Sequence, residues 1–114
     1  MLIKEYNKNI TFDKGSGILK FVIRGKSYNV KKEEVLNSMM NNKSEKILNY
    51  FVKVGDKIYP PKQVITDMFK IHKLFFTTID AIKILNELGF EIGWWEKENN
   101  KLMIIYNGKS PKKG

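Results

Sequence analysis

A chain of 114 residues with 42% hydrophobic content is long enough to form one modest hydrophobic core. It contains no cysteine, which excludes disulfides and thiolate ligands, and its single histidine, His72, argues against a dedicated zinc site. No stretch approaches the ~18 apolar residues of a membrane span, and the first residues lack the apolar segment of a signal peptide. We therefore expect a cytoplasmic protein without a membrane partner.

Positive charge is the strongest signal in the composition. Twenty-one basic residues against twelve acidic ones give a net charge of +9, which favours nucleic acid through contacts to its phosphates. Residues 1–74 carry fifteen bases and seven acids, residues 75–108 carry three and five, and residues 109–114 add three bases. Arg24 is the only arginine, so the planar fork that reads guanine edges exists at one position. Binding should therefore depend mainly on the nucleic-acid backbone.

The first predicted unit is a hairpin that leads into a helix. The first dozen residues are mixed and polar, and Asp13–Gly17 (DKGSG) predicts a turn or linker. Residues 18–23 are strand-like, Gly25–Lys26 are predicted to form a turn, and residues 27–30 are predicted to form the returning strand of the hairpin. Helical periodicity follows over residues 31–40.

The second predicted unit has the same order. A short helix at residues 45–48 precedes a strand at 50–54, Gly55–Asp56 form the hairpin turn, and residues 58–59 return. Matching residues recur with a period of 30: Phe21 and Phe51, Val22 and Val52, Gly25 and Gly55, Lys32 and Lys62, and Val35 and Ile65. This weak periodicity is compatible with a duplication or with a common supersecondary preference.

The next helix is predicted to begin at Pro61, because proline at the first helical position needs no partner for its missing N–H. Its apolar residues predict a buried stripe of Val64, Ile65, Met68, Phe69 and Ile71. The opposite face is polar at spacings of four, four and three residues: Lys62, Thr66, Lys70 and Lys73. This spacing predicts three aligned ammonium groups, although a simple solvated helix face has the same pattern.

The third predicted helix covers residues 77–88. Thr77 and Asp80 form a pair typical of a capping box, and Gly89 is typical of a helix end. Its predicted buried residues are Ile79, Ala81, Ile82, Ile84, Leu85 and Leu88. With the hairpin that follows, the sequence predicts an α+β fold: a small single domain of short helices and β-hairpins whose C-terminal half is winged-helix-like. In a winged helix this third helix is usually the one that contacts DNA, but here it lies in residues 75–108, the segment with more acids than bases.

The last predicted hairpin, residues 90–95 and 102–106, contains adjacent tryptophans. Neighbouring strand residues face opposite ways, so Trp94 is predicted to join the core with Phe90 and Ile92. Trp95 is predicted to be half-exposed, where it could stack on a base, contact a protein or cover the hairpin edge. The strand at 102–106 is apolar on both faces, so the N-terminal half or a second copy should cover it.

Catalytic constellations are weak in this sequence. The tripeptide GKS at Gly25–Ser27 and again at Gly108–Ser110 lacks the preceding glycine of a phosphate-binding loop. The acidic residues do not form a pair suited to a nuclease centre, and His72 has no neighbouring nucleophile. We expect no enzyme activity, no catalytic residue, no metal, no cofactor and no small-molecule substrate.

One segment resembles a known module. The run from Tyr50 through Gly55, Asp56, Tyr59 and Lys62, followed by the closing residues Leu85, Leu88, Gly89, Phe90, Glu91 and Ile92, resembles the N-terminal head domain of ScoMcrA-like modification-dependent restriction endonucleases of the HNH type. The similarity covers residues 45–93, and no nuclease or modified-base-reading motif accompanies it. The resemblance implies a stand-alone module that associates with DNA without cleaving it.

These observations predict a non-catalytic, basic nucleic-acid-binding protein associated with restriction–modification, with DNA favoured over RNA. The predicted organisation is an N-terminal strand–turn–helix segment (residues 1–44), a head-like core (45–108) and a basic disordered tail (109–114). The predicted binding residues are Lys53, Lys57, Tyr59, Lys62, Thr66, Lys70, Lys73 and Trp95. The alternative is a protein-interaction or regulatory module of a restriction system, an archaeon or a virus, with a homodimer as one form.

Overall fold

The computed structural model describes residues 9–107, with residues 97 and 99 excepted. The elements of this part of the chain are, in order, β1 (Ile10–Asp13), β2 (Ile18–Ile23), β3 (Lys26–Lys31), α1 (Lys32–Met39), β4 (Tyr50–Val54), β5 (Lys57–Tyr59), α2 (Pro61–Phe69), the 3₁₀ helix η2 (Lys73–Phe75), α3 (Thr78–Glu87), β6 (Glu91–Glu96) and β7 (Lys101–Asn107). The predicted basic tail lies outside the described residues. The predicted α+β class is confirmed, whereas the winged-helix-like description stays a prediction.

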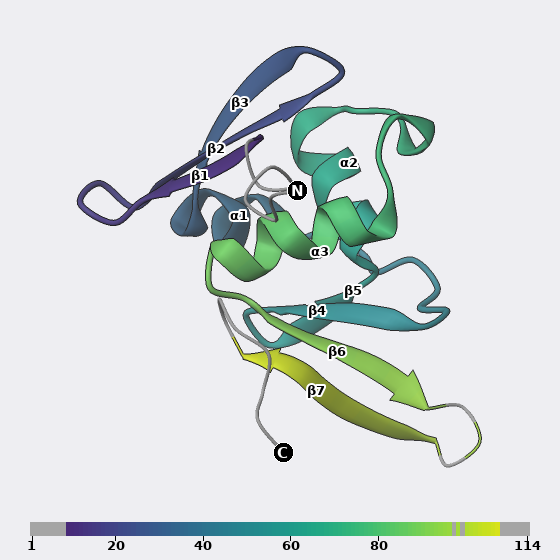
Figure 1. Cartoon of the computed structure of the whole chain (residues 1–114). Coiled ribbons are helices and arrows are strands. Elements are labelled where there is room, and N and C mark those ends of the chain that lie inside the picture. The colour runs from purple at the N-terminus through teal and green to yellow at the C-terminus, as the bar shows by residue number, and fades with distance from the viewer. Residues whose placement is uncertain (1–8, 97, 99, 108–114) are drawn as a thin grey trace, which may run out of the picture.

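The strands form two antiparallel sheets with helices between them (Figure 1). One sheet has the order β1-β2-β3 and the other has the order β5-β4-β6-β7. Helix α1 contacts β3 and β4, and α3 contacts β2 and β6, so both helices contact strands of both sheets. Because β4 pairs with β6 and not only with β5, the last hairpin is joined to the middle of the chain.

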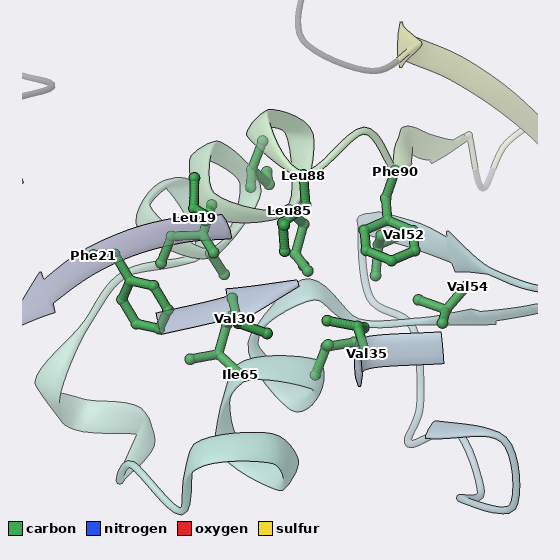
Figure 2. Close-up of a cluster of buried hydrophobic side chains, with 14 of the residues drawn as sticks. Leu19, Phe21, Val30, Val35, Val52, Val54, Ile65, Leu85, Leu88 and Phe90 are labelled. Atoms are coloured by element: carbon green, nitrogen blue, oxygen red, sulfur yellow. The ribbon is translucent and has the colours of Figure 1, made fainter. Parts of the chain in front are cut away.

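One hydrophobic core holds both sheets to the helices. Figure 2 shows Leu19 and Phe21 of β2 facing Ile65 of α2 and Leu85 of α3, with Val52 of β4 on the other side. Buried residues of this cluster come from both sides of residue 44, where the sequence suggested a boundary. That boundary stays a prediction, and the two segments share one core.

Local sequence signals place most of the elements correctly. Pro61 begins α2, and Thr77 and Asp80 form a complete capping box at the start of α3. Gly55 has φ 67°, as the first central residue of a type II′ hairpin turn requires. Gly89, with φ 97°, follows the end of α3 as predicted.

Two expected elements are wrong and one was missed. Residues 45–48 form no helix, because side chains of other elements take the backbone hydrogen-bonding groups of Asn42, Lys43 and Glu45. Helix α2 stops at Phe69, because Lys70 adopts a left-handed conformation (φ 59°) and closes the helix with a bond from its N–H to the Thr66 carbonyl. Strand β1 was missed because its four residues were too few to stand out from the polar N-terminus.

The second sheet depends on a glycine beneath a buried ring. Gly93 of β6 lies opposite Phe51 of β4, and Phe51 is 2% exposed. A Cβ added at Gly93 would clash with the Phe51 ring and with the Met103 carbonyl oxygen. Neither obstacle can move easily, since one is a buried ring and the other is backbone.

We therefore expect Gly93→Ala to lower the free energy of unfolding by about 1–3 kcal/mol, the cost of overpacking a filled site. Gly15→Ala is the matched control, because a Cβ there meets only the Asp13 side chain at an ordinary contact distance of 3.5 Å. Urea unfolding followed by circular dichroism measures both variants. A Gly93→Ala protein as stable as the Gly15→Ala protein would contradict this account of the sheet.

Candidate nucleic-acid interface

A groove of about 330 Å³ lies where the start of β4, the start of α2, η2 and the start of α3 meet. We call it the lysine groove, because Lys46, Lys62 and Lys73 line it. One acid, Glu45, and the half-buried ring of Tyr50 also line it. Thr78, the first residue of α3, contributes the positive end of a helix dipole. The groove therefore combines cations with an aromatic ring.

A buried amide holds one wall of the lysine groove. Gln63 of α2 is 3% exposed, and its Nε2 donates to the Lys43 carbonyl at 2.8 Å and to Asp67 Oδ2 at 3.0 Å. Its Oε1 accepts from the Glu45 N–H at 2.8 Å. Asp67 also accepts from Asn42 Nδ2 at 3.2 Å. This network fixes the segment that carries Lys46, because leaving any hydrogen bond of a buried amide unmade lowers the stability of the folded protein.

The buried hydroxyl of Tyr59 fixes the same segment from the other side. It donates to the Met39 carbonyl at 2.7 Å and lies 3.2 Å from the Asn42 carbonyl. Burial, followed by the charges of Asp56 and Asp67, raises the pKa of Tyr59 above its usual value. The hydroxyl therefore contacts α1 and the segment after it. With 1% of its surface exposed, the ring has no face for a base, and we remove Tyr59 from the candidate interface.

Lys62 and Lys73 lie together in the lysine groove, but not as one helix face. Lys62 Nζ donates to the Lys73 carbonyl at 2.9 Å and lies 5.3 Å from the centre of the Phe76 ring. Lys73 belongs to η2, and its Nζ lies 3.2 Å from Glu45 Oε1. Both lysines keep further N–H donors, because an ammonium group has three.

The rest of the predicted lysine stripe is wrong, because α2 ends at Phe69. Lys70 is the left-handed residue that closes α2, so it does not continue the row. Thr66 Oγ1 is buried and has no hydrogen-bond partner in the described part of the chain. Lys70 is exposed, and neither residue lines the groove.

The other predicted residues lie elsewhere. Lys53 lines a separate pocket beside Lys32, and Lys57 donates to the Met40 carbonyl at 3.0 Å. Trp95 is half-buried as expected and lines an apolar pocket with Ile47 and Ile58, where its Nε1 lies 3.4 Å from Asn100 Oδ1. The structure therefore brings together Lys62 and Lys73 and separates them from Lys53, Lys57 and Trp95.

An aromatic pair lies at the edge of the groove. Tyr50 and Trp94 are opposite each other on β4 and β6, with ring centres 4.9 Å apart in an edge-to-face arrangement. The expectation that Trp94 is a core residue is wrong, since its side chain is half-buried. Lys46, Tyr50 and Gln63 were not among the predicted site residues, because their convergence depends on how the segment before β4 packs on α2. The sequence feature that could have indicated this site is the turn-like run of polar residues before β4.

Helix α3 has little surface to offer as a recognition helix. Ala81, Ile82, Ile84, Leu85 and Asn86 are all buried among its ten residues. Ile79 was expected in this buried face and is 50% exposed, so that expectation is wrong. His72 acts as a helix-end residue, because its Nδ1 accepts from the Leu74 N–H at 3.1 Å.

Comparison with known proteins places the chain in one family. The sequence model of the SCO5918-like family matches residues 19–111. The chain belongs to the SCO5918-like family. In this SCO5918-like protein, the match includes every residue of the lysine groove. Neither the curated proteins nor the solved structures contain a significant match.

Within residues 9–107, apart from 97 and 99, no group of three His, Asp or Glu side chains is placed to hold a metal ion. No helix there has the length and apolar character needed to cross a lipid bilayer.

The Tyr59 hydroxyl gives a test of how the groove wall is held. Tyr59→Phe leaves the Met39 and Asn42 carbonyls without this donor, and we expect the free energy of unfolding to fall by about 1–3 kcal/mol. Tyr50→Phe is the control, because the Tyr50 hydroxyl has no hydrogen-bond partner among the described residues. Equal stability of the two variants in urea unfolding would contradict the assigned role.

The same hydroxyl predicts a pH dependence. Because the folded-state pKa of Tyr59 is raised, its contribution to stability is complete below the unfolded pKa of about 10 and is lost as pH rises through the folded value. Urea unfolding between pH 8 and the alkaline limit should show a fall in stability for the wild type that is smaller in Tyr59→Phe. Identical pH profiles would overturn this prediction.

Proposed function

We propose that this SCO5918-like protein is a non-catalytic nucleic-acid-binding module that holds a strand of DNA in the lysine groove. The observation that carries the proposal is the convergence of Lys46, Lys62, Lys73 and Tyr50 on one groove. Cations along a groove neutralise phosphates, and an aromatic ring beside them offers a stacking surface for a base. The net charge of +9 supports the same class of partner.

The available cations can be ranked by what else they contact. Lys46 is exposed and has no hydrogen-bond or ion-pair partner in the described part of the chain. Lys73 is half-exposed and paired with one acid, and such a surface pair is worth only about 0–1 kcal/mol, so a phosphate can compete for it. Lys62 has a backbone carbonyl and a ring as partners, so it supports the groove as well as contributing charge. Lys46 and Lys73 are therefore the primary phosphate contacts in this proposal.

The resemblance to ScoMcrA-like head domains supports a DNA-associated role of the same kind. It rests on the hairpin and α2 start, which carry Pro60 and Lys62 of the lysine groove. We propose association with a restriction–modification system on that resemblance.

A protein-interaction role is the second candidate, and a specific surface favours it. Leu74 is 83% exposed, Phe75 is 46% exposed and Ile79 is 50% exposed within one short segment. Neighbouring exposed apolar side chains are more typical of a contact site than single ones. Strand β7 is also an edge strand, paired with β6 alone in the second sheet, which keeps a homodimer as one form of this candidate.

The test of the nucleic-acid proposal removes two charges at the groove. We expect the double variant Lys46→Gln, Lys73→Gln to bind single-stranded and duplex DNA less tightly. The slope of log affinity against log salt concentration should flatten by up to ~1.4 for single strands or ~1.8 for duplex. Fluorescence anisotropy at several salt concentrations measures both quantities.

The matched control is Lys14→Gln, Lys20→Gln, which removes the same charge from exposed positions on the first hairpin. In Figure 1 the turn between β1 and β2 lies at the opposite end of the molecule from the connection between α2 and α3. Equal effects of the two double variants would indicate diffuse attraction by net charge and contradict the groove. Absence of salt-dependent binding by the wild type would contradict nucleic-acid binding altogether.

A further inference from the structure

The only arginine of the chain, Arg24, lies in the turn between β2 and β3, in a backbone conformation that most residues avoid. Arg24 has φ 54° and Gly25 has φ 79°, and together they form the two-residue turn between β2 and β3. Positive φ at both central residues is the type I′ pattern, for which Asn-Gly and Gly-Gly are the favoured pairs. A long, β-carbon-bearing side chain at the first position is locally unfavourable, and such positions recur at functional sites.

The guanidinium group of Arg24 is held against an aromatic ring from a distant segment. Its central carbon lies 4.2 Å from the centre of the Phe75 ring. Phe75 is the last residue of η2, and that turn is fixed by two bonds to His72: the Leu74 N–H to Nδ1 at 3.1 Å and the Phe75 N–H to the carbonyl at 3.0 Å. No acid lies within ion-pair distance of Arg24 among the described residues. The stacking orients the fork while leaving its N–H donors available.

A pocket of about 180 Å³ opens beside this stack. Its walls come from β1, β2, the β2–β3 turn, η2 and α3, and its charged lining residues are Arg24, Asp80 and Lys83. One carboxylate oxygen of Asp80 accepts from the Thr77 N–H at 2.9 Å. The pocket is comparable in size to the cavity of roughly 150 Å³ that admits a benzene ring in another protein. It therefore presents a donor fork, an acceptor and an apolar wall around space for one ring system.

We propose that this pocket binds a guanine base. Guanine presents two acceptors, O6 and N7, that match the fork of Arg24, and two N–H donor groups that match a carboxylate such as that of Asp80. Thymine and cytosine lack the paired O6 and N7 acceptors, and adenine has a donor in place of O6. Arg24 is thus the residue that confers base preference on an otherwise backbone-directed protein.

The pocket and the lysine groove can serve one strand. Lys73 and Phe75 are the two ends of the three-residue η2, with Lys73 lining the groove and Phe75 lining the guanine pocket. Leu74 between them is the most exposed large hydrophobic side chain of the described residues. A strand whose phosphates contact the groove would cross Leu74 and place a neighbouring base at Arg24. This part of the inference rests on the proposed function, whereas the guanine pocket itself does not.

The experiment compares dodecamers of thymidine with dodecamers that contain one central guanine or one central 7-deazaguanine, which lacks the N7 acceptor. We expect the guanine strand to bind the wild type about tenfold more tightly than the plain strand, and the 7-deazaguanine strand to lose most of that gain. Arg24→Lys keeps the charge but removes the fork, so it should lose the guanine preference and retain the affinity and salt slope for the plain strand. Phe75→Leu should weaken the preference in the same way. Arg24→Gly relieves the backbone strain, so it should lose the preference while its melting temperature stays equal or rises.

A second arm uses deoxyguanosine monophosphate and thymidine monophosphate as free ligands, followed by NMR shifts of the Arg24 side chain. Selective binding of the guanine nucleotide without binding of any strand would support the pocket and contradict the proposed function. Strand binding with no guanine preference, or a preference that survives in Arg24→Lys, would overturn the pocket and leave the proposed function intact. Absence of binding in both arms would overturn both.

Discussion

The burial of α3 is the constraint on which the rest of this structure depends. The helix contacts β2 of one sheet and β6 of the other, and half of its residues are buried. A helix covered on two sides contributes a large share of the core but has little side-chain surface left for a ligand. The segment before α3 is therefore a natural place for a site. Both proposed sites use it: the lysine groove joins Lys73 of η2 to Thr78, and the guanine pocket joins Phe75 of η2 to Asp80 and Lys83 on the exposed part of α3.

Two lysines hold the ends of α3 in the same way. Lys62 of α2 donates to the Lys73 carbonyl and lies over Phe76, just before α3. Lys32 of α1 donates to the Gly89 carbonyl at 3.2 Å and lies 5.1 Å from the centre of the Phe90 ring, just after it. These lysines are thirty residues apart and match in the weak sequence period. The two hairpin–helix units thus have the same element order and make equivalent contacts, while their origin by duplication stays a hypothesis.

These contacts change how the net charge should be understood. Lys32, Lys57 and Lys62 each donate to a backbone carbonyl, so part of the positive charge also supports the fold. Lys46 has no such partner among the described residues, and Arg24 is oriented by a ring instead of an acid. Charge that is either unpartnered or stacked can be neutralised by a polyanion without breaking the fold. The distribution of these partners, more than the total charge, supports the two proposed sites.

The sequence by itself determined the local elements, because their signals depend on neighbouring residues. Pro61 starts α2, Thr77 and Asp80 cap α3, and Gly55 forms a hairpin turn for reasons of backbone geometry that need no tertiary contact. The α+β class follows from the same kind of information, and the net charge of +9 predicts a polyanionic partner. The sequence did not determine which side chains are accessible to a ligand. Tyr59 is an example, because a tyrosine in a hairpin is buried or exposed according to the distant residues that pack on it.

Only the tertiary structure decided which distant residues meet. The pairing of β4 with β6, the hydrogen bonds of Gln63 to Lys43 and Glu45, and the contact of Arg24 with the Phe75 ring all join segments far apart in the chain. No local pattern encodes such contacts, because each is selected by how well the whole core packs and by whether every buried polar group finds a partner. The left-handed Lys70 is the clearest example. The helical period of the sequence continues through Lys70 to Lys73. Because α2 closes at Phe69, Lys73 belongs instead to η2, where it pairs with Glu45 and lines the same groove as Lys46.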